Sequence, residues 1–141
     1  MKRPKEAIRK GAYGIVIHDG KVLMCHTWCR GRIIRNFPGG ALDVGESPQQ
    51  GLRREFEEEV GAPPEIGEVL YSCERGKSPD YPSAGLAYSY YRARLDIGRV
   101  SLRGNGDDVE NLEWVPLDAL PLDDMLEVDK AAWLAMRAKL V

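Results

Sequence analysis

Runs of apolar residues, separated by polar turns, predict several β-strands along the chain. The first two runs, 11–18 and 21–28, flank Asp19 and Gly20, a residue pair typical of the two-residue turn of a β-hairpin. Three later runs, one of which holds three tyrosines, also favour strands. We therefore expect strands at 11–18, 21–28, 66–73, 86–95 and 112–115.

The segments between these runs are polar or rich in turn-forming residues. Residues 29–36 carry several arginines and indicate a loop, and the Phe-Pro-Gly-Gly sequence at 37–40 favours a turn. Glycines and prolines within 74–85 indicate a long loop. A single helical turn is expected at 116–120, and apolar residues at helical spacing predict a closing helix over 129–140.

The strongest helical signal lies at 47–61, where start and stop signals agree. Ser47 is a good N-cap, Gln50 completes a capping box with it, and Pro48 falls at the first helical position, where a missing N–H costs little. Gly61 suits a left-handed C-terminal cap, and two prolines soon follow it. The sequence therefore predicts a helix with defined ends.

Two neighbouring faces of this helix differ in chemistry. One is apolar and is expected to be buried, and it consists of Leu52, Phe56 and Val60. Glu55, Glu58 and Glu59 lie at i, i+3 and i+4, so their carboxylates converge beside the apolar face. Acids in the last turns of a helix oppose its dipole by roughly 0.3–1 kcal/mol each. A hard divalent cation would relieve this conflict, and the alternative is a solvated acidic face.

Length and composition place the chain among globular proteins. Its 141 residues predict one domain over 1–141, with 43% apolar and 30% charged residues. The net charge of −2 excludes a general basic field for nucleic acid, so an anionic substrate would need local cations. The cysteines lack the spacing of a disulfide or zinc framework, which predicts three free thiols at Cys25, Cys29 and Cys73. No apolar stretch is long enough to span a membrane, and we expect a soluble cytoplasmic protein with no membrane partner.

One segment resembles the Nudix box of the Nudix hydrolases. That box combines a glycine, a glutamate, an Arg-Glu pair, a Glu-Glu pair and a final glycine at fixed spacings. The chain meets each fixed position, with Gly40, Glu46, Arg54, Glu55, Glu58, Glu59 and Gly61. Only Ala62 is smaller than the aliphatic residue usual at its position. The apolar hairpin, the Phe-Pro-Gly-Gly sequence and the Trp-Val-Pro-Leu-Asp segment at 114–118 are also similar to the family.

The resemblance implies an α/β/α sandwich with a mixed β-sheet. In that fold the box forms a catalytic loop–helix–loop that binds Mg²⁺ or Mn²⁺. The implied metal ligands are the Gly40 carbonyl and the carboxylates of Glu55, Glu58 and Glu59.

Two further roles are implied near the box. Glu46 and Arg54 would form an ion pair that supports the box structurally. The family often adds one acid from a loop well after the box, and Asp108 is the first candidate, ahead of Asp107 and Glu110.

The implied activity is metal-dependent hydrolysis of the phosphoanhydride bond of a nucleoside diphosphate linked to another moiety. Bound metal ions would neutralise phosphate oxygens and lower the pKa of a bound water. Glu55 is the first candidate for the general base and Asp108 the second, and Glu58 completes the catalytic set.

Candidate substrate-binding residues lie outside the box. Three arginines could bind outer phosphates or only keep their segment soluble, and these are Arg30, Arg32 and Arg35. Three aromatic residues could stack on a base or pack in the core or on the surface, and these are Trp28, Tyr81 and Tyr88. The box does not distinguish an oxidised nucleotide, a nucleotide sugar, ADP-ribose, a dinucleoside polyphosphate or a capped RNA.

Three alternative functions stay open on the same fold. A nucleotide-sensing module would bind without cleaving, although such proteins usually lose box acids. An RNA 5′-pyrophosphohydrolase is suggested by the basic start of the chain, although the net negative charge weighs against extended RNA contact. An isomerase of prenyl diphosphates would need a well-placed cysteine acid, and neither Cys25 nor Cys73 has the expected surroundings. Many family members are homodimers, so a second copy of the chain is a candidate partner beside the nucleotide.

Overall fold

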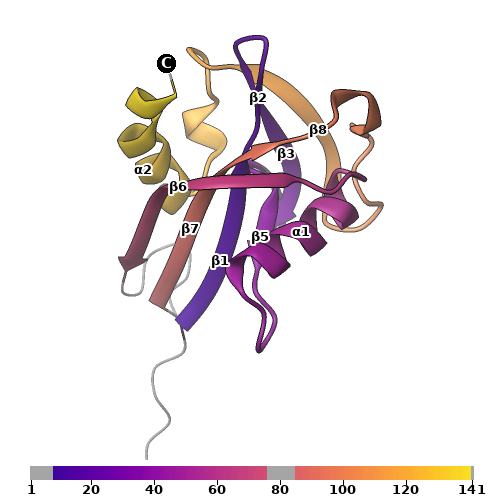
Figure 1. Ribbon diagram of the computed structural model, residues 1–141. Coiled ribbons are helices and arrows are strands. Elements are labelled where there is room, and N and C mark those ends of the chain that lie inside the picture. Colours follow the sequence, from indigo (N-terminus) through magenta and orange to yellow (C-terminus); the bar gives the residue numbers. More distant parts are fainter. Residues whose placement is uncertain (1–7, 76–84, 141) are drawn as a thin grey trace, which may run out of the picture.

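The computed structural model describes residues 8–75 and 85–140 of the chain, as two β-sheets with two α-helices (Figure 1). The strands are β1 (Ile8–Ile15), β2 (Ile17–His18), β3 (Lys21–Cys29), β4 (Arg32–Asn36), β5 (Gly39–Ala41), β6 (Glu65–Arg75), β7 (Gly85–Arg94) and β8 (Val109–Pro116). The helices are α1 (Pro48–Glu59) and α2 (Glu127–Met136), with short 3₁₀ helices at Ile97–Arg99, Leu122–Asp124 and Arg137–Lys139.

The first sheet has the strand order β5-β1-β7-β6 and is mixed. Strands β1 and β7 are parallel, whereas β5 pairs with β1 and β6 pairs with β7 in antiparallel fashion. The second sheet is antiparallel and centres on β3, which pairs with β2, β4 and β8. The predicted α/β class with a mixed sheet is confirmed.

The two α-helices lie on opposite sides of the first sheet, as Figure 1 shows with β1 and β7 between them. On the α1 side, Phe56 packs directly over Gly14 of β1, where an added Cβ would lie 2.4 Å from the ring. On the α2 side, Trp133 and Met136 join a second core cluster with Tyr90 of β7. This layering brings residues of both helices to the strands of one sheet.

Helix α1 forms because its predicted caps are all present. The Ser47 hydroxyl accepts a hydrogen bond from the Gln50 N–H at 3.1 Å, and the Gln50 side chain accepts one from the Ser47 N–H at 2.9 Å. Gly61, just after the helix, has a φ of +81°, as a left-handed cap requires. The predicted apolar face is buried, since Leu52, Phe56 and Val60 are all fully enclosed.

The segment 29–36 is not the loop that its arginines suggested, because β4 occupies most of it. Arg30 and Gly31 form a two-residue turn with φ of +53° and +83°, so β3 and β4 make a tight hairpin. Ile34 is 2% exposed in the core, while Arg32 and Arg35 flank it on the chain. The two adjacent β-branched residues Ile33 and Ile34 were the signal of a strand.

The Phe-Pro-Gly-Gly sequence does not end as a turn either, because Gly39 and Gly40 belong to β5. Gly39 pairs with Tyr13 of β1 at a φ of +141°. A Cβ at residue 39 would lie 2.2 Å from the carbonyl oxygen of Ala12. Only glycine permits this close pairing, and it places the backbone of the box against the centre of the first sheet.

Two other predicted elements need correction. The expected helical turn at 116–120 is a hydrogen-bonded turn and not a helix: the Ala119 N–H donates to the Pro116 carbonyl at 3.0 Å, and the 3₁₀ helix follows at Leu122–Asp124. The closing helix begins two residues earlier than predicted, at Glu127, and ends at Met136. In the expected loop at 74–85, Glu74 and Arg75 extend β6 and Gly85 starts β7, and 76–84 lie outside the described residues.

Candidate active site

Three carboxylates from distant parts of the chain line one cleft of about 290 Å³ beside the first sheet. Glu55 and Glu59 enter it from α1, and Asp108 enters from the segment before β8. Gly39 and Gly40 of β5 form the adjoining wall. The cleft therefore collects the first glycine of the box and the glycine before it, two box acids, and acids from outside the box, of which Asp108 is one.

Glu59 is one of only two charged residues that are buried in the described part of the chain, at 5% exposure. Its Oε1 accepts a hydrogen bond from the Gly39 N–H at 2.8 Å. Burial raises the pKa of this carboxyl well above its ordinary value, and repulsion from Glu55 and Asp108 raises it further, against the hydrogen bond from Gly39. Because burial and the two neighbouring acids destabilise the ionised form of Glu59, a cation bound beside it would be favourable.

Glu55 lies against the backbone of Gly40. A Cβ at residue 40 would come within 2.9 Å of the Glu55 carboxyl carbon, so the glycine makes room for this acid. Burial raises the pKa of Glu55, the charges of Glu58 and Asp108 add to the rise, and the hydrogen bond from Arg54 opposes it. The Arg54 Nη1 lies 3.0 Å from Glu55 Oε1.

The ion pair expected between Glu46 and Arg54 is present and is bidentate. Arg54 Nε and Nη2 donate to the two Glu46 oxygens at 2.8 and 2.9 Å. Arg54 Nη2 also donates to the Ala41 carbonyl at 3.2 Å, and the Asp43 N–H donates to Glu46 at 2.7 Å. The hydrogen bonds from Arg54 lower the pKa of Glu46 to about 2. These contacts fasten the loop that precedes α1 onto the helix.

Asp108 is held in place by its own loop. Its Oδ1 accepts a hydrogen bond from the Asn105 side chain at 2.9 Å, and its carbonyl accepts one from the Trp28 N–H at 2.8 Å. The neighbouring acids Asp107 and Glu110 are exposed and do not line the cleft.

Glu58 differs from the other box acids in its placement. Its side chain is 54% exposed, lies 3.6 Å from Arg54 Nη1 and does not line the cleft. Within residues 8–75 and 85–140, no three acids, histidines or cysteines are close enough to hold a metal ion as they stand. The donor set still fits a hard divalent cation in its chemistry, because it consists of oxygen donors that repel one another beside a glycine backbone.

None of the three arginines proposed from the sequence for substrate binding is among the residues that line this cleft. Arg35 bonds to Glu113 and Asp124, each at 3.3 Å, and so links β4 to β8 and to the 3₁₀ helix Leu122–Asp124. Arg30 and Arg32 lie in and beside the exposed turn of the β3–β4 hairpin.

Sequence reasoning missed a second set of cleft residues. Arg9 of β1 lines the cleft and donates from Nε to the Tyr88 hydroxyl at 2.7 Å. Asp129 of α2 also lines it, is 2% exposed, and accepts a hydrogen bond from the Tyr90 hydroxyl at 2.6 Å. An acid in the first turn of a helix is usually a solvated cap, so nothing in the sequence marked Asp129 as buried.

Of the aromatic candidates for stacking, only one is available in the described structure. Trp28 lines the cleft and is 53% exposed. Tyr88 is 2% exposed and bonded to Arg9, which places it in the core together with Tyr90. Tyr81 lies outside the described residues.

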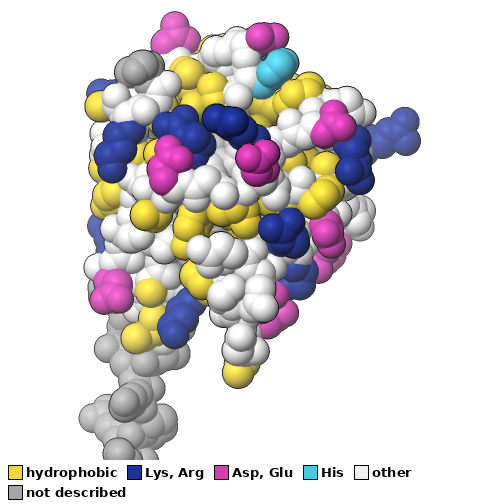
Figure 2. Space-filling model, viewed as in Figure 1, with side chains coloured by type: hydrophobic (Ala, Val, Ile, Leu, Met, Phe, Trp, Pro, Cys, Tyr) yellow, Lys and Arg dark blue, Asp and Glu magenta, His cyan; other side chains and the backbone are white. Residues whose placement is uncertain are grey.

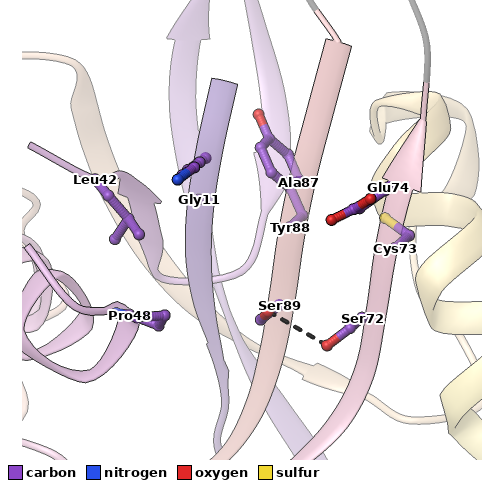
Figure 3. Close-up of a pocket in the computed structure, with 10 residues that line it drawn as sticks. Gly11, Leu42, Pro48, Ser72, Cys73, Glu74, Ala87, Tyr88 and Ser89 are labelled. Carbon is purple, nitrogen blue, oxygen red and sulfur yellow. Dashed lines mark hydrogen bonds between the residues drawn. The ribbon is translucent and has the colours of Figure 1, made fainter. Parts of the chain in front are cut away.

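A second hollow, of about 270 Å³, lies on the α1 side of the first sheet (Figure 3). Leu42 and Pro48 form one wall, and Ser72 and Ser89 lie 3.3 Å apart on the neighbouring strands β6 and β7. Its lining holds a single acid, Glu74, so it lacks the acid cluster of the first cleft.

The three cysteines are free thiols, as expected. Cys25 is fully buried and does not line the cleft. Burial raises the pKa of this thiol well above its ordinary value, and the charges of Glu59 and Asp108 add to the effect. No helix in the described part of the chain is long and apolar enough to cross a membrane.

Comparisons with known proteins identify the family. A family model for the NUDIX domain matches residues 8–136. A nucleoside triphosphate pyrophosphatase/Nudix hydrolase fusion protein of Bifidobacterium longum is 35% identical over 104 residues, which are 73% of this chain and 20% of that protein. An 8-oxo-dGTP diphosphatase of Haemophilus influenzae is 42% identical over 62 residues, or 44% of this chain and 43% of the relative. An RNA pyrophosphohydrolase of Cellvibrio japonicus is 41% identical over 68 residues, or 45% and 37% of the two chains.

The chain thus spans less than half the length of these three relatives. Among solved structures, a MutT NUDIX hydrolase from Burkholderia pseudomallei has a TM-score of 0.77 at 24% identity, over 92% of this chain and 98% of that chain. At this identity the likeness shows the fold alone. The family model, in contrast, covers most of the chain and includes the whole box. The chain therefore belongs to the NUDIX family.

Proposed function

We propose that the protein is a metal-dependent pyrophosphohydrolase that cleaves the phosphoanhydride bond of a nucleoside diphosphate linked to another moiety. The observation that carries this proposal is the cleft in which Glu55, Glu59 and Asp108 meet the backbone of Gly39 and Gly40. The relatives named above as a diphosphatase and a pyrophosphohydrolase support the same reaction class.

The residues that would hold Mg²⁺ or Mn²⁺ are the Gly40 carbonyl, Glu55, Glu59 and Glu58. The metal, when bound, supplies charge neutralisation of the phosphate oxygens and a more acidic water. Glu55 is the first choice for the group that accepts the proton of the attacking water, because its carboxylate lines the cleft against the backbone of Gly40. Asp108 is the second choice, since it lines the same cleft.

The cleft also holds two polar side chains that suit the edge of a nucleobase. Asp129 has a buried carboxylate that accepts from Tyr90, and the Asn36 Oδ1 accepts from the Thr27 hydroxyl at 2.6 Å. The amide N–H groups of Asn36 and the second oxygen of Asp129 are a donor and an acceptor of the kind that pair with the polar edge of a base. Leu126 adds apolar surface to the same cleft.

The test is release of phosphate or nucleotide from a panel of nucleoside diphosphate derivatives with Mg²⁺, with Mn²⁺ and with EDTA. We expect release from one or a few members that depends on metal. Glu55→Gln should lower kcat by about 10²–10⁴-fold, the usual value of general base catalysis. Glu57→Gln removes the same charge from an exposed position on α1 and should leave the rate unchanged. Equal rates with metal and with EDTA would refute the proposal.

An RNA 5′ end is the second candidate substrate. The exposed Arg30 and Arg32 at the tip of the β3–β4 hairpin, and the RNA pyrophosphohydrolase relative, favour it. Cleavage of a 5′-triphosphorylated RNA should then weaken steeply with salt, because each phosphate contact releases counterions. A flat salt response would count against RNA. Binding of nucleotides without any turnover would instead indicate a sensing module, which the intact set of box acids disfavours.

A further inference from the structure

Asn105 lies in the loop between the 3₁₀ helix Ile97–Arg99 and β8, three residues before Asp108. Its side-chain oxygen Oδ1 accepts hydrogen bonds from the Asp107 N–H at 2.9 Å and from the Val109 N–H at 3.0 Å. Its side-chain nitrogen Nδ2 donates to Oδ1 of the Asp108 carboxylate at 2.9 Å. The Asn105 amide therefore binds the backbone on both sides of Asp108 and also the Asp108 carboxylate.

These partners fix which way the Asn105 amide faces. Backbone N–H groups can only donate, so the atom that faces Asp107 and Val109 is the amide oxygen. The amide nitrogen must then face the Asp108 carboxylate, which can only accept when it is ionised. A carboxylate at residue 105 would lack the donor, and a serine hydroxyl would be too short to reach the same partners. The two kinds of contact therefore require an amide of this length.

The backbone at Asp108 is also held by contacts that do not involve the Asn105 side chain. The Trp28 N–H donates to the Asp108 carbonyl at 2.8 Å, and the Asn105 N–H donates to the carbonyl of the buried Val109 at 3.0 Å. Gly104 has a φ of +77°, and a Cβ there would lie 2.2 Å from the Val109 carbonyl oxygen. The contribution that depends on the Asn105 amide nitrogen is therefore the direction of the Asp108 side chain.

The Asp108 carboxylate would not stay in the cleft without such a contact. Asp108 is exposed, and exposed side chains change rotamer readily. Its charge raises the pKa of Glu55 and of Glu59, which means that the three carboxylates repel one another. Within residues 8–75 and 85–140, the hydrogen bond from Asn105 is the only one made to the Asp108 carboxylate. Asn105 therefore opposes rotation of Asp108 away from the other acids.

We propose that Asn105 is a positioning residue for hydrolysis, which holds the Asp108 carboxylate beside Glu55 and Glu59 in the cleft. This inference rests on the function proposed above and on a part for Asp108 in the reaction. Asn105 does not itself line the cleft, so it acts through Asp108. A shift of a catalytic group by about 1 Å can lower a rate by about 10²-fold, so loss of this hydrogen bond should be visible in kcat.

Two substitutions of Asn105 test the proposal. Asn105→Asp keeps an oxygen for the two backbone N–H groups and replaces the donor to Asp108 by a second oxygen that repels it. Asn105→Ser keeps a hydroxyl close to the backbone, does not reach Asp108 and adds no charge. Each should lower kcat by about 10–100-fold and change KM by less than about twofold, because Asn105 makes no contact with the bound substrate.

The probes are ADP-ribose, UDP-glucose, diadenosine tetraphosphate, dGTP and a 5′-triphosphorylated RNA, each with Mg²⁺. The variants are compared on the probe that the unsubstituted protein cleaves fastest. Asn111→Asp is the matched control, because it adds the same charge on β8 at a residue that does not line the cleft, and it should leave kcat unchanged. Urea unfolding with EDTA shows whether each variant keeps its fold, and if one Asn105 variant unfolds, the other carries the comparison.

A double substitution separates positioning from a general effect on the loop. Asp108→Asn alone should lower kcat. Adding Asn105→Ser to Asp108→Asn should then lower kcat by less than about a further twofold, because no carboxylate is left to position. A residue that only stabilised the loop would lower kcat by the same factor in both backgrounds.

Each other outcome overturns the inference. A wild-type kcat for a folded Asn105 variant, or for Asp108→Asn, would show that this contact does not serve the reaction, and the proposed function would stand with Glu55 as the base. Equal effects of Asn105→Ser in the two backgrounds, or unfolding of both Asn105 variants, would assign Asn105 to the loop structure alone. If the unsubstituted protein cleaves none of the probes, the proposed function fails and the inference fails with it.

Discussion

Each box residue is placed by a specific contact of its own side chain or backbone. The Glu59 carboxylate accepts a hydrogen bond from the Gly39 N–H, and the Glu55 carboxyl contacts the Gly40 backbone. Two guanidinium nitrogens of Arg54 donate to the Glu46 carboxylate. Glu58 alone points toward solvent, at 54% exposure. The acids therefore differ in the free energy needed to ionise them, because the Glu59 carboxyl is buried and the Glu58 carboxyl is exposed.

The exposed position of Glu58 gives a prediction about activity and stability. Glu58→Gln should abolish turnover if this acid binds the metal, and should leave the metal-free protein as stable as before or slightly more so. Removing the charge of Glu58 relieves its repulsion from Glu55, three residues earlier, by a few tenths of a kcal/mol, and this gain offsets the loss of its exposed contact with Arg54. Turnover with Mg²⁺ and urea unfolding with EDTA measure the two effects. A wild-type rate would exclude Glu58 as a ligand.

The pKa of Glu46 predicts how the box responds to acid. Its pKa is lowered from 4.5 to about 2 by Arg54, so its contribution to stability is present above pH 4.5 and is lost as the pH falls toward 2. Glu46→Gln should therefore be less stable than the wild type at pH 7, and the difference should vanish near pH 2. Urea unfolding across this range measures it, with the exposed Glu65→Gln as control. A difference that does not depend on pH would contradict the assignment.

The acids of α1 could be predicted from the sequence because their i, i+3, i+4 spacing places their carboxylates close together on one helix. Asp108 was ranked ahead of its neighbours Asp107 and Glu110, and it is the one of these three acids that lines the cleft. Arg9 and Asp129 were missed, because each becomes a cleft residue only through the packing of β1 and α2 against strands far away in the chain. Local pattern cannot show which face of such an element a distant strand will cover.

At the level of elements, the caps of α1 and the two-residue hairpin turn at Asp19 and Gly20 were reliable signals. The ends of α1 and the Asp19–Gly20 hairpin turn follow from local backbone chemistry, and both are present. The expected loop at 29–36 was wrong because the arginines on either side of Ile33 and Ile34 outweighed the strand signal of these two residues, of which Ile34 is buried. The secondary structure of this segment therefore depends on the burial of Ile34 in the core and not on the local excess of polar residues.

The N-terminal cap of α1 gives a direct stability prediction. Ser47→Ala removes the acceptor for the Gln50 N–H and should lower the free energy of unfolding by about 1 kcal/mol. Urea unfolding measures it, and Ser72→Ala, at an exposed serine of β6, serves as the control. An unchanged midpoint would mean that the cap does not contribute.

The close approach of β5 to β1 gives a second prediction for an element. Gly39→Ala would place a Cβ 2.2 Å from the Ala12 carbonyl oxygen at a φ of +141°, so we expect loss of the native fold or a large drop in Tm. Gly45→Ala is the matched control, because φ is +83° there and nothing lies within 4 Å of the added Cβ. It should cost only about 1–3 kcal/mol of backbone strain. Equal effects at the two positions would contradict the steric argument.

At the scale of the whole molecule, polar contacts between side chains, one buried and one exposed, link the layers. The Tyr90 hydroxyl bonds to Asp129 and joins the first sheet to α2, while Arg35 joins the second sheet to the segment that leads into α2. Basic and acidic side chains are interspersed on the face that β6 crosses, as Figure 2 shows, so this face presents no broad field of one sign. Specific contacts in the cleft, and not a general field, must then select the substrate.

The link between the first sheet and α2 gives a prediction at this scale. Tyr90→Phe removes a hydrogen bond to a carboxylate that is 2% exposed and should lower the free energy of unfolding by about 1.5–3 kcal/mol. Tyr71→Phe, on the neighbouring strand β6, removes a hydroxyl that lies in a less buried position and should change little. Chemical denaturation of the two variants measures the difference. Equal decreases in the free energy of unfolding would show that the hydrogen bond to Asp129 contributes no more than an exposed hydroxyl does.

The order in which cleft residues occur along the chain has a consequence for biosynthesis. Glu55, Glu59 and Asp108 are incorporated before any residue of α2 during synthesis, whereas Asp129 is added later. A polypeptide that ends after β8 would carry these three acids but would lack Trp133 and Met136, which pack in the core with Tyr90. We therefore expect such a truncated product to expose apolar surface and to form no complete cleft.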